Sequence, residues 1–531
     1  MKMISKKKSC NMYWLLYILS FSVINVSIYM KEEKLLTSNS IYILVWNVGV
    51  IAVALAIFLK KIVKPLVEKY ALRSVEIKYS DQDIKYYWIV MVSQIICWLP
   101  VFLAYYPGLF AYDVAGQIPQ KIGSYSTHHP LAHTLYLQFF YYCIGKKMGY
   151  TTGIAIATIV QMIIFSMMKS YIHLYLYRVG CNKVIRYVLI ALIGILPIYS
   201  LIAIAMTKDV IFTGCVGVCF VSLCYYYNDY MVAERRKSYG IIYIISIIGT
   251  ILFRNNGIFP IFFSLILIAM DANKNKRKQL LLYTLIGIGL GIMCSLSLKF
   301  ILQAESGSKN EALSLPYQQI ACAYINNKEQ MSEEQITQVL AVLPDADRYV
   351  PYLADPVKYS AKGTENWKQF VSIYAKMGLK YPKSYLEAFI KLNAGYLGIT
   401  DYTFAEIYGK ENRQGVLLTD TKEGFRIEHR SYLPKLEQLY EYLFTENEYK
   451  NMWAVNLLLS PAFYFWIVML LLIYAICIRN KRTIVPFAFL LTLILTLFAG
   501  PCSLIRYALP FIVCIAPLAT CVFNKTEVGS K

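Results

Sequence analysis

Charged residues are scarce in this sequence. Asp, Glu, Lys and Arg make up 16% of its 531 residues, whereas about 25% is usual in soluble domains, and 57% of the residues are hydrophobic. The mean hydropathy is +0.47, and the apolar residues are gathered in long runs. A run of about 18 or more apolar residues is typical of a membrane-spanning helix. The composition therefore excludes an ordinary soluble enzyme and predicts an all-α polytopic membrane protein.

Several sequence features that would indicate other classes of protein are also missing. The 13 cysteines include no CxxC motif, so neither a disulfide framework nor a standard zinc site is indicated. The first ten residues carry four lysines, but no small-residue cleavage site follows the apolar run 13–30. We therefore expect that run to be retained as the first span. No internal repeat and no low-complexity segment is present.

The net charge of +21 has a distribution that argues against a nucleic-acid partner. The lysines and arginines lie in short clusters between apolar runs, as the positive-inside rule expects of cytoplasmic loops. We therefore expect the lipid bilayer to be the partner of the basic residues and expect no nucleic acid.

The apolar runs predict about 12 transmembrane helices. A polar stretch, 303–455, separates the ninth from the tenth and holds 20 of the 32 acidic residues together with 17 basic ones. We expect this stretch to form one mainly helical extracytoplasmic domain, between an N-terminal transmembrane module, 1–302, and C-terminal helices, 456–531. The predicted spans are 13–30, 41–59, 86–104, 151–177, 187–204, 209–228, 239–253, 257–270, 280–302, 456–478, 483–499 and 503–523.

The fragment 130–144 determines the orientation of everything after it. It has about 15 residues, whereas about 20 are needed to cross a bilayer, so we expect a juxtamembrane helix on the outer side. The inner segments then hold 26 lysines and arginines, and the short outer segments hold 8. This bias predicts a multi-pass protein of the plasma membrane with cytoplasmic N- and C-termini and an extracellular 303–455 domain.

This topology brings five groups of polar residues to the outer face. Ionisable groups at membrane depth are costly and are therefore candidates for a functional site. The candidates are Asp113 and Gln117 after the third span, His128 and His129 with His133, Lys208 and Asp209, Arg254 and Asn255, and Arg506.

Each candidate also has a purely structural interpretation. Asp113 can serve as a loop carboxylate or a helix cap, and the histidines can anchor the chain at the interface or contact a phosphate. Lys208 and Asp209 can pair with each other at a helix start. Arg254 and Arg506 can extend towards water from helix ends. Their common side of the membrane, which follows from loop charge alone, favours a shared function.

One carboxylate that faces several fixed cations is suited to a reaction with a phosphate leaving group. The cations hold the phosphate through charge-assisted hydrogen bonds, and the carboxylate accepts the proton of an incoming hydroxyl group. A site outside the membrane has no access to cytoplasmic nucleotide sugars. The activated donor would therefore arrive on a lipid carrier.

With these motifs, residues 86–260 resemble the GT-C superfamily of integral membrane glycosyltransferases, in particular its protein-mannosyltransferase-like members, and look like a bacterial subgroup of it. Asp113 stands where those enzymes carry an essential acid in the first outer loop. His128-His129-Pro130-Leu131 resembles their basic residue followed by Pro-Pro-Leu, although one proline is missing. Thr207-Lys208-Asp209 matches the place of a second acid.

The resemblance implies a GT-C-like fold that moves a sugar from a polyprenyl-phosphate carrier to a glycan, lipid or protein acceptor of the cell envelope. It implies Asp113 as general base and the cations and polar groups listed above as phosphate or substrate contacts. A divalent metal ion at Asp113 and Asp209 is a further hypothesis, because some members of the superfamily hold one. The alternatives are a flippase or transporter of lipid-linked oligosaccharide, and a membrane polymerase or phosphotransferase of envelope polymers.

Overall fold

The computed structural model describes residues 2–29, 38–63, 65, 81–109, 112–227, 236–270, 274–399, 427–445 and 448–523. For some of these residues, Asp113 among them, it describes the backbone alone. The described part of the chain contains helices and isolated bridges but no strand, which confirms the predicted all-α class.

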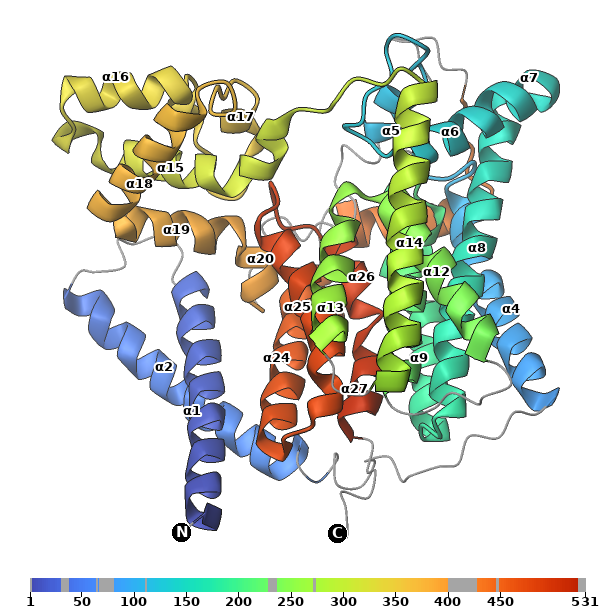
Figure 1. Ribbon diagram of the computed structural model, residues 1–531, viewed down its shortest axis with the longest axis horizontal. Helices are drawn as coiled ribbons and strands as arrows, with labels where there is room; N and C mark the ends of the chain where they lie inside the picture. Colours follow the sequence, from blue (N-terminus) through green and yellow to red (C-terminus); the bar gives the residue numbers. More distant parts are fainter. Residues whose placement is uncertain are drawn as a thin grey trace.

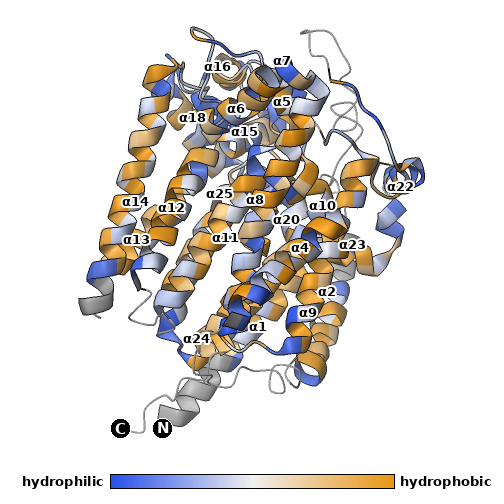
Figure 2. Ribbon diagram, turned by 90° about the vertical axis from the view of Figure 1, so that its right-hand side faces the viewer, coloured by the Kyte–Doolittle hydropathy of each residue, from blue (hydrophilic) through white to orange (hydrophobic). Residues whose placement is uncertain are grey.

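The long helices form a bundle. Eight of them are long and apolar enough to cross a membrane, and a ninth crossing results if one bent pair is counted as a single span. Three further apolar helical stretches, 11–26, 237–253 and 255–270, are shorter. Together these segments overlap all twelve predicted spans. Figure 2 shows the apolar residues along the bundle helices and many of the hydrophilic ones near their ends.

The bundle elements are α1 (Lys2–Tyr29), α2 (Ser38–Phe58), α4 (Asp81–Ala104), α8 (Tyr150–Arg178), α9 (Lys183–Ile195), α10 (Pro197–Ile204), α11 (Lys208–Tyr227), α12 (Arg236–Phe253), α13 (Ile258–Met270), α14 (Lys274–Ile301), α24 (Pro461–Ile478), α25 (Ile484–Phe498), α26 (Ile505–Ile512) and α27 (Ile515–Phe523).

The segment predicted as one span over 187–204 is broken. Helices α9 and α10 meet at an angle of 53°, with Leu196 extended between them. Pro197 explains the break, because proline cannot donate a backbone hydrogen bond and disfavours a helical conformation in the residue before it. The break directs α10 towards Ala205–Thr207, the short segment that leads into α11.

The fragment after Pro130 forms a short helical segment at one end of the bundle. It consists of α6 (Leu131–Gln138), a π-helical stretch (Phe139–Ile144) and α7 (Gly145–Met148), and it is not among the helices long and apolar enough to cross a membrane. In Figure 1 this segment and α5 (Tyr112–Gln117) lie at the top, whereas α1 begins at the opposite end of the bundle.

A separate helical unit lies at the same end of the bundle as α5–α7 (Figure 1). Its own core includes Tyr317, Ile320, Val339, Phe370 and Ile373. The unit comprises α15 (Ser314–Asn327), α16 (Glu333–Val342), α17 (Asp355–Lys358), α18 (Trp367–Lys380) and α19 (Pro382–Leu392).

Other described parts of the predicted 303–455 domain pack on the bundle. Tyr396 of α20 (Ala394–Leu397) belongs to the main core, as do Phe444 and Tyr449. Two short helices, α22 (Pro434–Tyr440) and α23 (Trp453–Leu459), follow in this part of the chain.

Candidate functional site

A buried ion pair joins the beginning of α11 to the end of α12. Asp209 lies in the first turn of α11, where the helix dipole favours a carboxylate. Arg254 directly follows α12, and its Nη1 donates a hydrogen bond to Oδ1 of Asp209 at 2.6 Å. The side chain of Asp209 is 2% exposed and that of Arg254 is 15% exposed. The pair therefore sits largely out of water, where a charge needs a partner.

A second arginine approaches the same carboxylate from α26. Arg506 is the second residue of this helix, and its Nε lies 4.0 Å from Oδ2 of Asp209. The aromatic ring of Tyr507 lies 4.5 Å from the guanidinium carbon of Arg254 and 5.0 Å from that of Arg506. Cations are attracted to aromatic faces at such distances. Tyr507 thus helps to hold two like charges on either side of one carboxylate.

Lys208 faces the histidine motif. Its Nζ lies 3.2 Å from Nδ1 of His129, and the rings of His128 and His129 are 4.5 Å apart, edge to face. Asn255 donates from Nδ2 to the backbone oxygen of Thr127 at 3.1 Å. The loop that carries Thr127, His128 and His129, here called the histidine loop, is therefore attached to both α11 and the segment after α12.

Gln117 is occupied in packing rather than open to a ligand. Its side chain is buried, donates to Thr134 at 3.1 Å and lies 3.1 Å from Nδ1 of His133. These contacts fasten α5 to α6. The predicted role of Gln117 as a substrate contact stays a prediction, and the contacts described here support the packing of α5 on α6. His133, the third histidine of the motif, belongs to the same buried network.

The backbone at Leu109, shortly before α5, pairs with the segment that leads into α11. The amide of Leu109 donates to Ile204 at 2.9 Å, and the amide of Met206 donates to Leu109 at 2.8 Å. Gly108 has a φ of +133°, which favours glycine, and a Cβ there would collide with Thr158. Asp113 follows four residues after Leu109. Its side chain lies outside the described part of the structure, so the predicted general base is placed only through its helix.

The separate unit α15–α19 and the adjoining α20 dock beside Arg506. Asn393 donates to the backbone oxygen of Phe498 at 3.2 Å, and Ser503 donates to that of Leu392 at 2.9 Å. Burial raises the pKa of the Cys502 thiol in this connecting loop to about 12. Cys502 therefore remains a neutral thiol at physiological pH and is unsuited as a nucleophile.

The site has three cations and one carboxylate on the described side chains. Arg254 and Arg506 flank Asp209, and Lys208 contacts His129 nearby. These three cations outnumber the one carboxylate, and such a site favours an anion with several oxygens. Both carboxylate oxygens of Asp209 face guanidinium groups, which disfavours a divalent cation at that position. Within the described residues no group of three His, Cys, Asp or Glu could hold a metal ion. The metal hypothesis for Asp113 and Asp209 stays a prediction.

Two supporting residues were not predicted as part of the site. Phe212 lies 5.6 Å from the guanidinium carbon of Arg254, and Thr127 accepts from Asn255. Phe212 follows Asp209 by three residues on α11, so the helical spacing of an aromatic residue and an acid was the available signal. Thr127 acts through its backbone and gave no signal in the sequence.

Comparison with known proteins identifies a family. The sequence model of the family described as "Family of unknown function (DUF6020)" matches residues 117–529. This is well over half of the chain, and the chain therefore belongs to that family. Neither the curated proteins nor the solved structures include a match.

Proposed function

We propose that this member of the DUF6020 family is a GT-C-type membrane glycosyltransferase. It takes a sugar from a polyprenyl-phosphate carrier and transfers it to a cell-envelope acceptor at the outer face of the plasma membrane. The observation that carries the proposal is the placement of Arg254 and Arg506 on either side of Asp209, while the preceding residue, Lys208, contacts His129 in the loop that leads into α6. Fixed cations in a site with little water stabilise a departing phosphate strongly.

The proposed reaction breaks the bond between the sugar and the carrier phosphate. Asp113 accepts the proton of the acceptor hydroxyl, whose oxygen forms the new bond to the sugar carbon. The polyprenyl phosphate leaves with the electron pair of the broken bond and is held by Lys208 and Arg254. Asp209 is a positioning residue, because its two guanidinium contacts fix the direction of both arginines. His128, His129 and Asn255 line the approach from the histidine loop.

The proposed topology has twelve crossings. Eight long apolar helices, the bent pair α9–α10 and three shorter apolar helices supply them. The end of the bundle that holds α5–α7 and α15–α19 is then extracytoplasmic, and the beginning of α1 is cytoplasmic (Figure 1). The connections around Arg178 and Arg482 belong to the cytoplasmic side, in agreement with the positive-inside rule.

The contact between His129 and Lys208 favours a second candidate. A histidine next to a lysine can act as the base in a phosphotransferase or polymerase of envelope polymers. The two candidates differ in the group that takes the proton, which is Asp113 in the first and His129 in the second. A lipid-linked oligosaccharide flippase needs neither group as a base.

The test measures consumption of the membrane pool of polyprenyl-phosphate-linked sugar by mass spectrometry, at matched expression. Asp113→Asn keeps the shape of the side chain and loses the base, so transfer should fall by on the order of 100-fold or more. Asp347→Asn alters an exposed aspartate of the separate unit and serves as the matched control. Loss of transfer in His129→Gln with full activity in Asp113→Asn would favour the second candidate. Equal transfer in all variants would reject both.

A further inference from the structure

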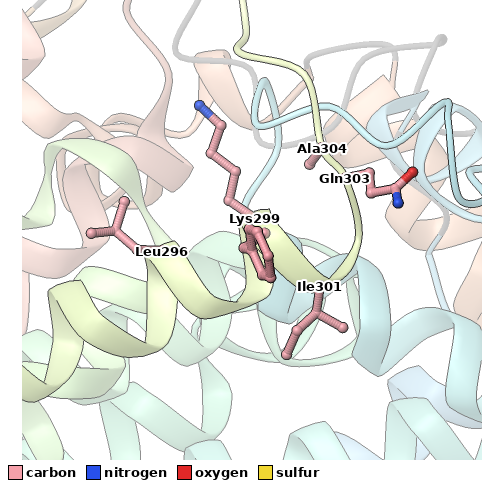
Figure 3. Close-up of a pocket in the computed structure, with 6 residues that line it drawn as sticks. Leu296, Lys299, Ile301, Gln303 and Ala304 are labelled. Carbon is pink, nitrogen blue, oxygen red and sulfur yellow. The ribbon is translucent and has the colours of Figure 1, made fainter.

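A groove lies on the surface of α14 at the end from which the chain continues to α15. The groove has a volume of about 540 Å³. The six residues that line it are Leu296, Lys299, Phe300, Ile301, Gln303 and Ala304. Figure 3 shows Lys299 and Gln303 extending to opposite sides of the turn that ends the helix, with Leu296 and Ile301 below them. The groove is separate from the cluster around Asp209 and takes no part in the proposed transfer.

The lower wall of the groove belongs to a surface suited to lipid. Phe300 is 85% exposed and Ile301 is 66% exposed, and the exposed apolar side chains continue along α14 through Leu296 and Met293. The other face of α14 packs on α12 and α13. Exposed side chains of this size, arranged in one stripe on a helix that is long enough to cross a membrane, would contact acyl chains.

The upper wall carries a positioned cation. Nζ of Lys299 donates a hydrogen bond to Oγ of Ser306 at 2.8 Å. An ammonium group has three donors, and this contact uses one of them. Lys299 also lies in the last turn of α14, where a cation complements the helix dipole. Its full charge exceeds the roughly half charge of the helix end, so Lys299 brings a positive charge to the apolar wall.

The turn that forms the groove is held in place by the histidine loop. Gln303 has a φ of +49° and ends the helix. The amide of Glu305 then donates to Tyr125 at 2.8 Å, and the amide of Gly307 donates to the hydroxyl of Thr127 at 3.0 Å. A Cβ on Gly307 would lie 2.8 Å from the Cα of His128. The groove therefore has a fixed outline, and it adjoins the loop that carries His128 and His129.

We propose that this groove binds an anionic phospholipid of the surrounding bilayer. Lys299 contacts the lipid phosphate, and Leu296, Phe300 and Ile301 contact the upper part of its acyl chains. Charge complementarity selects an anionic headgroup, and the continuity of the groove with the apolar stripe of α14 selects a lipid over a soluble phosphate. The inference does not depend on the proposed glycosyl transfer.

The experiment uses the full-length protein, purified in detergent and stripped of lipid, with native mass spectrometry as the readout. Phosphatidylglycerol is the anionic probe and phosphatidylcholine the neutral comparison. Wild type should bind one phosphatidylglycerol more tightly than phosphatidylcholine, and Lys299→Gln should weaken phosphatidylglycerol binding by about 10-fold. Lys299→Arg should retain it, because the cation is kept.

The matched control is Lys146→Gln, which removes an exposed lysine of α7 at the same end of the bundle. This variant should bind phosphatidylglycerol as wild type does. Phe300→Ala should weaken both lipids, since it removes a chain contact. Glycerol phosphate should not compete at concentrations at which the lipid binds. Equal phosphatidylglycerol affinity in wild type and Lys299→Gln, or an equal loss in Lys146→Gln, would overturn the proposal.

Discussion

Arg254 and Asp209 form an ion pair of 2.6 Å between residues that are 45 positions apart in the chain. Asp209 lies in the first turn of α11 and Arg254 follows α12, so the pair connects the beginning of one helix to the end of its neighbour. Arg506 approaches the other oxygen of the carboxylate from α26. One buried acid thereby orients two basic side chains that would otherwise repel each other. The proposed phosphate site depends on this arrangement.

The first prediction concerns the stability of this ion pair. Asp209→Asn leaves two guanidinium groups without their counter-charge, and the loss of one partner from a buried pair costs about 3 kcal/mol or more. The double variant Asp209→Asn/Arg254→Gln should recover part of this loss, because the uncompensated charge is reduced. Thermal unfolding of the purified protein measures both changes.

The control for this measurement is an exposed pair of the same chemistry. Arg348 lies 3.8 Å from Asp345 with its side chain 68% exposed, so Arg348→Gln should change stability by less than about 1 kcal/mol. If Asp209→Asn were no more destabilising than Arg348→Gln, the ion pair would not be the structural centre of the site.

The second prediction concerns topology. A cysteine introduced at Glu329, which is exposed before α16, should react with a membrane-impermeant maleimide in intact cells. A cysteine at Lys481, in the connection between α24 and α25, should react only after the membrane is opened. The background is a variant without other reactive cysteines. The reverse pattern would invert the proposed orientation and place the cluster around Asp209 in the cytoplasm.

The positions of the helices were predictable from sequence because burial in lipid requires long apolar segments with internally paired backbone groups. The fragment 130–144 was too short to predict a span, and it forms α6 and the π-helical stretch Phe139–Ile144 at one end of the bundle. Its predicted outer side of the membrane stays a prediction. The break at Pro197 was missed, because the residues on both sides of it are equally apolar and hydropathy does not register a bend. The proline itself was the available signal.

The partners of individual side chains were less predictable. Lys208 and Asp209 were open to pairing with each other, yet the structure pairs Asp209 with Arg254 and Lys208 with His129. Successive residues of a helix point about 100° apart, so each reaches a different neighbour. Which distant loop supplies that neighbour depends on helix packing, and the local sequence carries no record of it. Gln117 was assigned to the site from its position in the sequence, which did not show that its side chain is buried and donates a hydrogen bond to Thr134.

The third prediction concerns a buried lysine of the separate unit. Lys358 forms ion pairs of 2.7 Å with both Glu311 and Asp355. Burial alone would lower the pKa of Lys358, but the hydrogen bonds that it donates to Asp355 and Glu311 raise the pKa above its ordinary value of 10.5. Lys358→Met should destabilise the unit by about 1–2 kcal/mol, at the low end for charged hydrogen bonds because both acids are about one-third exposed.

The pH dependence of this effect follows from the direction of the pKa shift. A raised pKa in the folded state contributes stability that is complete below pH 10.5 and is lost as the pH rises through the higher folded value. The difference between wild type and Lys358→Met should therefore stay constant from pH 7 to about 10 and decrease only above that range. The rate of cleavage within 314–392 of the full-length protein, by a protease active at alkaline pH, measures it. A difference that already declined near pH 8 would contradict the assignment.

The last prediction separates binding from structure at Lys208. In the proposed reaction Lys208 holds the phosphate of the donor, so Lys208→Ala should raise the KM for the carrier-linked sugar by roughly 10- to 100-fold, as expected from a lost charge-assisted hydrogen bond. Lys208→Arg keeps the charge and should retain most of the affinity. Lys147→Ala, at an exposed lysine of α7, should leave KM unchanged. Because Lys208 also contacts His129, its loss would disturb the histidine loop as well. Thr127→Val tests this effect, because it removes the hydroxyl that accepts from the Gly307 amide and leaves Lys208 and His129 in place. A KM that rises as much in Thr127→Val as in Lys208→Ala would assign Lys208 to the support of the loop. A KM that rises in Lys208→Ala alone would support its contact with the donor phosphate.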